Sequence, residues 1–482
     1  MYFIRRIGAN IMTCRPRHPL RAASSAENAP AEWLRRLLEG RTKPPKLYAW
    51  TPENLPVRIR SAEQSLPTES QSQRPGGDDE RRRIYVLGIG NLGRLYASFL
   101  AKSAERAPIT LVVHRRELLE SWADHPGIEL VRDGKAERNA EFDIEWWTEA
   151  APPRGPVREP GRSRGSICNL IVATKAADTL PQVDRLRRYL GAGSTVAFTQ
   201  NGVCKLWPPL GATYVAARWP SGTGPSWLAC VTTHGVTSLG PFRSVHASPA
   251  GVLVGVVTPV SSDRGHGSNS TGTGSKVSAY SGGEYLIEQL VNAPGLAAQR
   301  LPTRELWVSQ LEKLVVNSVI NPLTAVLRCR NGEIFADRGD RLPAVIDELL
   351  AEASRVLRAL AEHSSTDAVL AAEAGEGGGG SDQDLREFRG ALAQRFAPAR
   401  LRAMLDGVAA KVGANTSSML QDVRAGRTTE VADLNGWLVD AARYVGAEAG
   451  GGGLPAHEKL VALVSDGAKM TREELVQHVL GR

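Results

Sequence analysis

The sequence contains few cysteines and no long apolar run, and both absences limit what the protein can be. No two cysteines form a CxxC pair, which argues against a disulfide framework or a zinc site and fits a reducing compartment; the five are Cys14, Cys168, Cys204, Cys230 and Cys329. No run of about 18 apolar residues occurs. With 482 residues and 42% hydrophobic content, the chain is expected to form two or three globular domains, with no metal site and no membrane partner.

The chain also lacks an excess of basic residues outside its N-terminal region. Residues 1–83 hold 16 Lys and Arg against 9 Asp and Glu, whereas the other 399 residues hold 43 against 42. The net charge of +8 therefore comes almost entirely from the N-terminal region, and no basic helix follows it. Binding to nucleic acid is not expected.

Acidic residues are missing from the chain before Glu27, although five arginines occur there. Arg-rich, acid-poor leaders resemble mitochondrial transit peptides, so residues 1–30 are interpreted as a mitochondrial transit segment. The alternative is an N-terminal extension without a targeting function, on a cytoplasmic protein. Residues 31–83 are largely rich in Pro, Ser, Gln and Arg and are predicted to form a linker with little order, in which residues 33–38 could form a short helix.

Strand and helix patterns alternate from Ile84 onward. Short apolar runs predict strands at residues 84–87, 109–113, 168–173 and 195–198, with helices up to about 104 and over 178–190. This pattern predicts an α/β Rossmann-type N-terminal domain, a parallel sheet with flanking helices, over residues 84–300.

From about Leu301 the pattern becomes helical almost throughout. Helices are predicted at residues 303–328, 343–363, 384–412, 428–446 and 455–480, which makes residues 301–482 an all-α C-terminal domain. Two low-complexity inserts, residues 261–283 and 371–384, cannot build a core and are expected to be disordered surface loops.

A glycine-rich turn follows the first predicted strand. The sequence "GIGNLG" places Gly88, Gly90 and Gly93 between a strand and a helix, the context that a dinucleotide-binding loop requires. The residues that would contact a dinucleotide there are Gly88, Ile89, Gly90, Asn91, Leu92 and Gly93. A purely structural turn is the alternative.

The end of the second strand bears on the choice of dinucleotide. NAD-specific sites tend to place an acid there, about 20 residues on, whereas this chain has His114, Arg115 and Arg116. A guanidinium group suits a 2′-phosphate, so NADP is the predicted cofactor, with Arg115 as its contact. Two solvated arginines at the start of a helix are the alternative.

A polar seam runs along an otherwise apolar helix pattern in "LEKLVVNSVINPLTAV", residues 311–326. Lys313, Asn317 and Asn321 are four residues apart and so fall on one face of a helix. Because buried polar groups without partners are costly, this seam must face either a polar core network or a ligand. Pro322 disfavours a continuous α-helix through Asn321, so a kink or a break is expected there.

Two long stretches, "LEKLVVNSVINPLTAVLRCRNGE" and "SSMLQDVRAGRTTEVADLNG", give the chain a recognisable relationship. Together with "GIGNLG", "VATKAAD" and "FTQNGV", they resemble the ketopantoate reductase family (2-dehydropantoate 2-reductase). The resemblance runs from about Ile84 to the C-terminus, without the two inserts. It departs from the family pattern at Asn91, where Ala is commoner, and at Ala432, where the usual Asp is displaced to Asp433.

The resemblance implies roles for individual residues. It places the catalytic lysine at Lys313. It implies cofactor contacts at Lys175, Asn201, Val236 (through its backbone) and Glu430, and substrate contacts at Asn201, Asn317, Asn321, Asn331 and Ser418. Lys313 would stabilise the developing alkoxide and then protonate it, with its pKa lowered by apolar surroundings.

The implied function is the NADPH-dependent reduction of 2-dehydropantoate to pantoate, a step towards pantothenate and coenzyme A. Two alternatives stay open: a reductase of the same family acting on another branched 2-oxo acid, and a catalytically silent NADP-binding regulator. The partner is thus a small 2-oxo acid, and the sequence leaves open whether the protein is a monomer or a homodimer.

Overall fold

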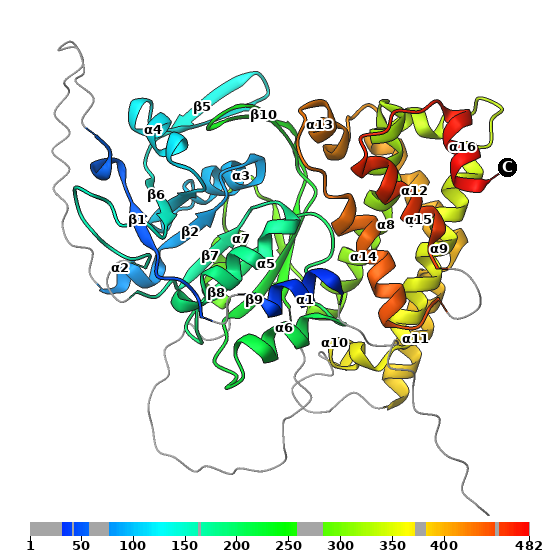
Figure 1. The fold of residues 1–482 in the computed structure, drawn as a ribbon, viewed down its shortest axis with the longest axis horizontal. Coiled ribbons are helices and arrows are strands. Elements are labelled where there is room, and N and C mark those ends of the chain that lie inside the picture. The colour runs from blue at the N-terminus through cyan, green and yellow to red at the C-terminus, as the bar shows by residue number, and fades with distance from the viewer. Residues whose placement is uncertain are drawn as a thin grey trace, which may run out of the picture.

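The computed structural model describes residues 31–40, 43–56, 77–161, 165–257, 283–371, 382–448 and 453–481. The predicted transit segment 1–30 lies outside the described residues, as do most of the two predicted inserts, although 382–384 of the second belong to a helix. An α/β half and a helical half lie side by side (Figure 1). A membrane-crossing helix, long and apolar enough, is not found in the described part of the chain.

The N-terminal half is built on a nine-stranded sheet with the order β1-β6-β3-β2-β7-β8-β9-β12-β13. Its six central strands are parallel, as predicted, but β1 runs antiparallel to β6 and β12 runs antiparallel to β9, so the sheet is mixed. The strands are β1 (Tyr48–Trp50), β2 (Ile84–Leu87), β3 (Ile109–Val113), β6 (Asp143–Thr148), β7 (Asn169–Val172), β8 (Thr195–Phe198), β9 (Ser226–Thr232), β12 (Val252–Val256) and β13 (Ala298–Arg300).

Alternate side chains of the central strands enter two separate cores, because successive residues of a strand point to opposite faces. In β2, Tyr85 and Leu87 join one core, and Ile84 and Val86 join the other. Helices cover both faces: α1 (Glu32–Glu39), α5 (Ala176–Arg185) and α6 (Gly211–Arg218) on the first, and α3 (Asn91–Leu100), α4 (Arg116–Asp124) and α7 (Glu284–Val291) on the second.

A second, four-stranded sheet packs beside α3, a feature that the sequence patterns did not indicate (Figure 1). Its order is β10-β11-β4-β5, and β11 pairs parallel with β4. The strands are β4 (Ile128–Arg132), β5 (Lys135–Asn139), β10 (Gly235–Gly240) and β11 (Arg243–Ser248).

The short helix predicted at residues 33–38 is confirmed as α1, but the prediction of a linker with little order is wrong for the chain around β1 and for the last residues before β2. Residues 32–39 form α1, β1 adds an edge strand to the main sheet, and α2 (Gly77–Arg82) leads into β2. The backbone N–H of Leu47 donates to Tyr189 Oη at 2.7 Å, and Leu34, Leu47 and Ala49 are buried. This part of the chain is therefore integral to the N-terminal half.

The C-terminal half is helical, as predicted, with several of the long predicted helices divided. The first core continues from the sheet into this half. The helices are α8 (Thr303–Leu327), α9 (Leu342–Glu362), α10 (Asp367–Ala371), α11 (Asp382–Arg395), α12 (Pro398–Val412), α13 (Ser418–Arg424), α14 (Val431–Tyr444), α15 (Pro455–Ser465) and α16 (Arg472–Leu480). This half also contains the short 3-10 turns η3 (Asn331–Phe335) and η4 (Ser364–Thr366), and the N-terminal half contains η1 (Pro52–Asn54) and η2 (Arg187–Tyr189).

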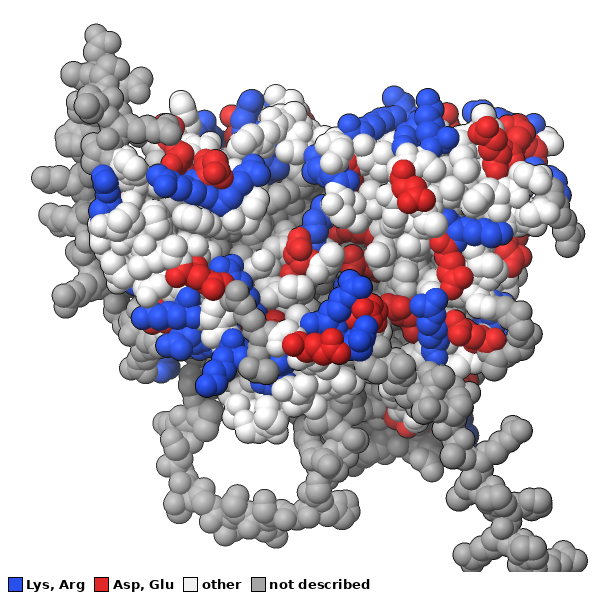
Figure 2. Space-filling view, viewed as in Figure 1, with Lys and Arg blue, Asp and Glu red and all other residues white. Residues whose placement is uncertain are grey.

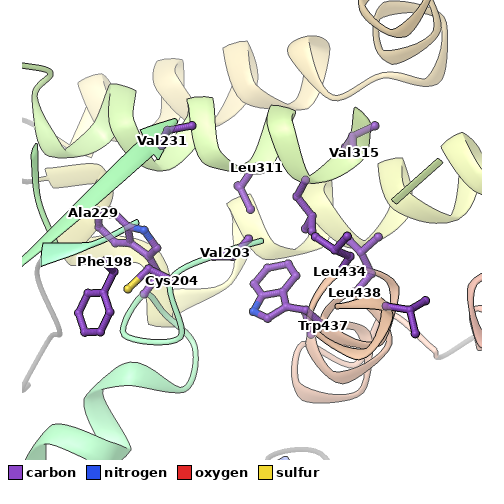
Figure 3. Packing of buried hydrophobic residues seen from close by; sticks show 14 of the residues in the cluster. Phe198, Val203, Cys204, Ala229, Val231, Leu311, Val315, Leu434, Trp437 and Leu438 are labelled. Carbon is purple, nitrogen blue, oxygen red and sulfur yellow. The ribbon is translucent and has the colours of Figure 1, made fainter. Parts of the chain in front are cut away.

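Helix α8 joins the two halves. Leu311 of α8, Trp437 of α14 and Val203 of the loop after β8 are buried in one cluster (Figure 3). Full burial of a leucine of this kind contributes about 1.5–3 kcal/mol to the free energy of unfolding. The halves are thus joined by an apolar contact beneath the carboxyl edge of the sheet.

Of the kink or break predicted at Pro322, the break does not occur: α8 continues for 25 residues through Asn321 and Pro322. A proline has no N–H to donate to the carbonyl four residues earlier, which is that of Ser318. Asn435 of α14 donates to this carbonyl instead, at 2.8 Å. A neighbouring helix therefore compensates for the lost hydrogen bond, and tertiary structure overrides the local tendency to break.

Candidate active site

Five parallel strands end at the same edge of the sheet, and the predicted site residues follow them. Gly88 comes after β2, Arg115 after β3, Lys175 after β7 and Asn201 after β8, while β9 ends at Thr232 itself. Ligands of open α/β sheets bind outside the carboxyl ends of the strands. The sheet therefore collects these residues on one side of the molecule, where α8 and α14 approach it.

The glycine-rich turn has the space that a dinucleotide needs. Gly88 has a φ of +93°, and a Cβ there would lie 2.9 Å from the carbonyl of Ala173. A Cβ on Gly93 would lie 2.0 Å from the oxygen of Gly88, whereas one on Gly90 would meet nothing within 4 Å. Gly88 and Gly93 thus serve close packing, and Gly90 borders open space.

The same open space faces the start of α3, for which Gly90 is the N-cap and which has no side-chain cap. Free N–H groups at a helix N-terminus favour a phosphate group. Ile89 and Leu92 are partly buried against the second core and hold the turn in place, and Asn91 donates to the backbone oxygen of Val236 at 3.1 Å. The residues of the turn therefore fit a pyrophosphate.

Arg115 and Arg116 differ in how free their guanidinium groups are. Arg115, the N-cap residue of α4, is exposed, and its one ion pair with a described residue, Glu117, has a length of 4.0 Å. Arg116 lies 2.9 Å from Glu120 one turn along the helix. Arg115 is therefore the better placed of the two to meet an anion at the end of β3.

Lys313 projects from α8 to the ends of β8 and β9. Its ammonium donates to Asn201 Oδ1 at 3.2 Å and to the carbonyl oxygen of Thr232. An ammonium has three N–H donors, and no described residue accepts the third. The group is thus oriented by two neutral acceptors and retains one donor for a ligand.

Glu430 stands behind this lysine, on the far side of Asn201. Asn201 Nδ2 donates to one carboxylate oxygen at 3.3 Å, and the backbone N–H of Ala176 donates to the other at 3.2 Å. Burial raises the pKa of Glu430, and Lys175 opposes this shift most strongly. Burial lowers the pKa of Lys313 to about 8, and Glu430 opposes that shift. Asn201 therefore bridges the two charged groups by hydrogen bonds, and their charges also affect each other without a direct ion pair.

Asn317 and Asn321 continue the seam from Lys313, and their side-chain amides have no partner among the described residues. Asn317 is partly exposed, while Asn321 is 7% exposed. A satisfied core network requires such partners for both amides. The arrangement therefore favours the ligand-facing alternative for the seam.

Ser418 and Asn331 are held differently from each other. Ser418 is exposed at the first position of α13, next to the N-cap Ser417, whose hydroxyl contacts Thr324 Oγ1 of α8 at 2.7 Å. Ser418 is thus anchored beside the Asn321 turn of α8. Asn331, in η3, donates from its amide nitrogen to the backbone oxygen of Val412 at 3.2 Å, whereas its buried amide oxygen has no partner among the described residues.

Lys175 is exposed and forms an ion pair with Asp422 of α13, which also pairs with Arg427 at 3.0 Å. A second ion pair connects the halves nearby, between Lys205 and Asp433 at 2.6 Å. Sequence reasoning missed Asp422 and Thr232, because an acid inside a matched stretch and a backbone carbonyl carry no signal of their own. It noted Asp433 only as a displaced family residue, without its partner.

One face of the molecule carries charges of both signs (Figure 2). Acidic and basic side chains are interspersed on the face shown in Figure 2, without an extended patch of one sign. Among the described residues no group of three or more His, Cys, Asp and Glu side chains could hold a metal ion.

Comparison with known families agrees with this geometry. Residues 84–259 match the family described as "Ketopantoate reductase PanE/ApbA", and residues 305–467 match "Ketopantoate reductase PanE/ApbA C terminal". Two solved structures share the fold: D-mandelate dehydrogenase with NADH and anilino(oxo)acetate (TM-score 0.52, 15% identity) and a PanE/ApbA family ketopantoate reductase from Ralstonia eutropha (TM-score 0.51, 17% identity). Each comparison covers 82% of this chain and 99% of the other.

Curated relatives extend over most of the chain. The ketoisovalerate reductase BEA2 of Gibberella fujikuroi is 39% identical over 93% of this chain and 98% of its own, and the ketoisovalerate reductase of Beauveria bassiana has the same three values. A probable 2-dehydropantoate 2-reductase of Schizosaccharomyces pombe is 28% identical over 76% of this chain and 92% of its own. The chain belongs to the ketopantoate reductase family of oxidoreductases.

Proposed function

We propose that the protein is an NADPH-dependent reductase that converts a branched 2-oxo acid to the 2-hydroxy acid, with Lys313 as general acid. The observation that carries this proposal is the arrangement of Lys313, which two neutral acceptors orient and which keeps one N–H for a ligand. A catalytically silent binding protein has no need of a buried amine whose pKa lies near 8.

The protein's own groups account for the polar part of such a reaction. The bound dinucleotide would supply the hydride. As negative charge develops on the oxygen at C2, the Lys313 ammonium stabilises it and then transfers a proton to it. Asn201 and the Thr232 carbonyl hold the ammonium in place, and Asn317, Asn321 and Ser418 offer neutral hydrogen-bonding groups for the carboxylate and the substituents of the acid.

NADP is proposed in preference to NAD because of the residues that follow β3. An acidic side chain at that position would accept a hydrogen bond from a ribose 2′-hydroxyl, whereas this chain has an exposed, weakly paired Arg115. A guanidinium group in that place suits a 2′-phosphate.

For the substrate, 2-ketoisovalerate is proposed ahead of 2-dehydropantoate. The relatives named ketoisovalerate reductase are 39% identical across nearly the whole chain, whereas the probable 2-dehydropantoate 2-reductase is 28% identical over 76% of it. The second candidate keeps support from the family match and from the neutral hydrogen-bonding side chains of the polar seam. In that case the product would be pantoate, a precursor of pantothenate and coenzyme A.

The two substrates differ by one hydroxymethyl group on C3, which makes a sharp test. NADPH oxidation would be followed with 2-ketoisovalerate, 2-dehydropantoate and pyruvate, and kcat/KM compared. A site that binds the extra hydroxyl rejects the analogue without it by about 10⁴, whereas an apolar pocket discriminates by about 10² or less. The Lys313→Ala variant serves as the blank. If the wild type reduces neither branched acid faster than this blank, the proposal is overturned.

We also propose that residues 1–30 direct the protein to mitochondria. The basis is the Arg-rich, acid-free composition before Glu27. A fluorescent reporter fused behind residues 1–30 is expected to enter mitochondria, and the reporter with its arginines changed to glutamine serves as the control. A diffuse cytosolic signal from the first fusion would contradict this proposal.

A further inference from the structure

Arg94 is a buried cation whose hydrogen-bonding partners are all neutral. It follows the glycine turn directly and is 4% exposed. Its Nε donates to the oxygen of Gly90 at 3.2 Å, and its terminal nitrogens donate to Gly240 O, to Asn91 Oδ1 at 2.9 Å and to Ser238 Oγ at 3.1 Å. No described carboxylate forms an ion pair with it.

These contacts connect the dinucleotide turn to the four-stranded sheet. Asn91 accepts from Arg94, donates to the backbone oxygen of Val236 and accepts from Ser244 Oγ at 3.4 Å. Asn91, which replaces the commoner Ala of the family, is therefore a structural link between α3, β10 and β11. A scaffold of this kind holds the guanidinium group against the first turn of α3.

A charge held in this way needs an explanation, because an uncompensated buried charge costs several kcal/mol. Burial lowers the pKa of Arg94 to about 10, so the group remains protonated at neutral pH. Its Nε donates a hydrogen bond to the backbone oxygen of Gly90, the residue that borders open space at the start of α3. An anion at that place would lie close to the guanidinium group and would supply the missing negative charge.

We propose that Arg94 is a positioning residue for the cofactor, which orders the glycine turn and adds a fixed positive charge beside the pyrophosphate. It acts through the turn and through its field, and it takes no part in proton transfer. This inference rests on the proposed dinucleotide-dependent function. The alternative is a neutral structural role, in which Arg94 only holds the small sheet against α3.

The test separates the pyrophosphate from the rest of the cofactor. Binding of NADPH and of adenosine 2′-monophosphate, which lacks the pyrophosphate, would be measured by calorimetry. Arg94→Gln should weaken the binding of NADPH by about tenfold, which is the scale of one charge interaction in a partly buried site. The affinity for the monophosphate should stay unchanged. Arg94→Lys should retain most of the affinity, and Arg115→Ala should weaken both ligands.

A second pair of variants keeps Arg94 and its packing. Ser238 is exposed and lies 3.1 Å from the guanidinium group, so Ser238→Asp would neutralise the charge from the side of the small sheet. Ser238→Asp is expected to weaken the binding of NADPH without a change in melting temperature. The uncharged Ser238→Asn is expected to leave both the NADPH affinity and the melting temperature unchanged. With saturating NADPH, kcat should stay near that of the wild type in both.

Two results would overturn the inference. One is NADPH affinity that is unchanged in both Arg94→Gln and Ser238→Asp, and the other is an equal loss for both ligands, which indicates a collapsed turn. If the wild type itself binds no dinucleotide, the proposed function and this inference fail together. Wild-type binding with no effect of the charge changes rejects the role of Arg94 alone.

Discussion

Asn435 of α14 donates a hydrogen bond to the carbonyl oxygen of Ser318 in α8, the acceptor that Pro322 leaves without its helical donor. Both residues are fully buried. The Asn435 amide also lies 2.9 Å from His457 Nδ1, and His457 Nε2 lies 3.1 Å from the oxygen of Leu349. The helix that carries the polar seam is therefore supported at Pro322 by a buried network from three other helices.

Removal of this donor should destabilise the protein. Asn435→Ala leaves a buried carbonyl without a partner, so the free energy of unfolding should fall by about 1–3 kcal/mol, as measured by urea denaturation. Pro322→Ala restores an N–H at the right place, and in the Asn435→Ala background it should recover part of the loss. Strictly additive effects of the two changes would contradict the compensation.

The seam itself should divide into catalytic and binding residues. Lys313→Ala is expected to lower kcat by about 10² to 10⁴, the range of general acid catalysis, while NADPH binding survives. Asn317→Ala and Asn321→Ala should raise the KM for the 2-oxo acid more than they lower kcat. Steady-state kinetics and melting temperatures on the same preparations check this, because a purely structural seam predicts a loss of stability in all three.

The reaction should become slower at alkaline pH. Only the protonated form of Lys313 can donate, and with its pKa lowered to about 8 that form is lost as the pH rises through 8. The kcat should therefore fall about tenfold per pH unit above the pKa. Because the Glu430 carboxylate opposes the shift, Glu430→Gln should move this fall to lower pH. An unchanged profile in Glu430→Gln would contradict the coupling.

Cofactor choice should depend on Arg115 more than on Arg116, because Glu120 holds the latter at 2.9 Å. Arg115→Ala is expected to raise the KM for NADPH at least about tenfold and to leave NADH nearly unaffected, since only NADPH carries the 2′-phosphate. Arg116→Ala is the matched control and should have a small effect. An equal loss with both cofactors would show that Arg115 does not discriminate between them.

Much of this arrangement follows from local patterns. Residue spacing alone predicts the glycine turn, the strands at residues 84–87 and 109–113, and the position of Lys313 on a helix. Each of these features depends mainly on residues that are close along the chain. The carboxyl edge of a parallel sheet then brings Lys175 and Asn201 together without further information.

Other features depend on contacts between distant residues and could not be predicted in this way. Pro322 disfavours a helix locally, and only the donor on Asn435, more than a hundred residues later, reverses this. Strand β1 has three residues, and its place is set by pairing with β6 about a hundred residues away. Composition alone therefore made an ordered edge of the sheet resemble a linker.

The N-terminal helix α1 reaches the contact between the two halves. The ammonium of Lys205 lies over the ring of Trp33, 4.7 Å from the ring centre. Lys205 also forms an ion pair with Asp433 at 2.6 Å. Asp433 follows Glu430 by three residues, and its backbone N–H donates to the oxygen of Glu430 at 3.0 Å. Helix α1 thus supports the start of α14, where Glu430 stands.

Changes in this series should have graded effects on stability. Trp33→Leu keeps apolar contact but removes the aromatic face, so the free energy of unfolding should fall by about 1 kcal/mol. Lys205→Met leaves the Asp433 carboxylate buried without a partner and should cost about 3–5 kcal/mol. Asp433→Asn in the Lys205→Met background removes that charge and should recover most of the loss. If Lys205→Met and the double variant unfold at the same urea concentration, the ion pair does not hold the halves together.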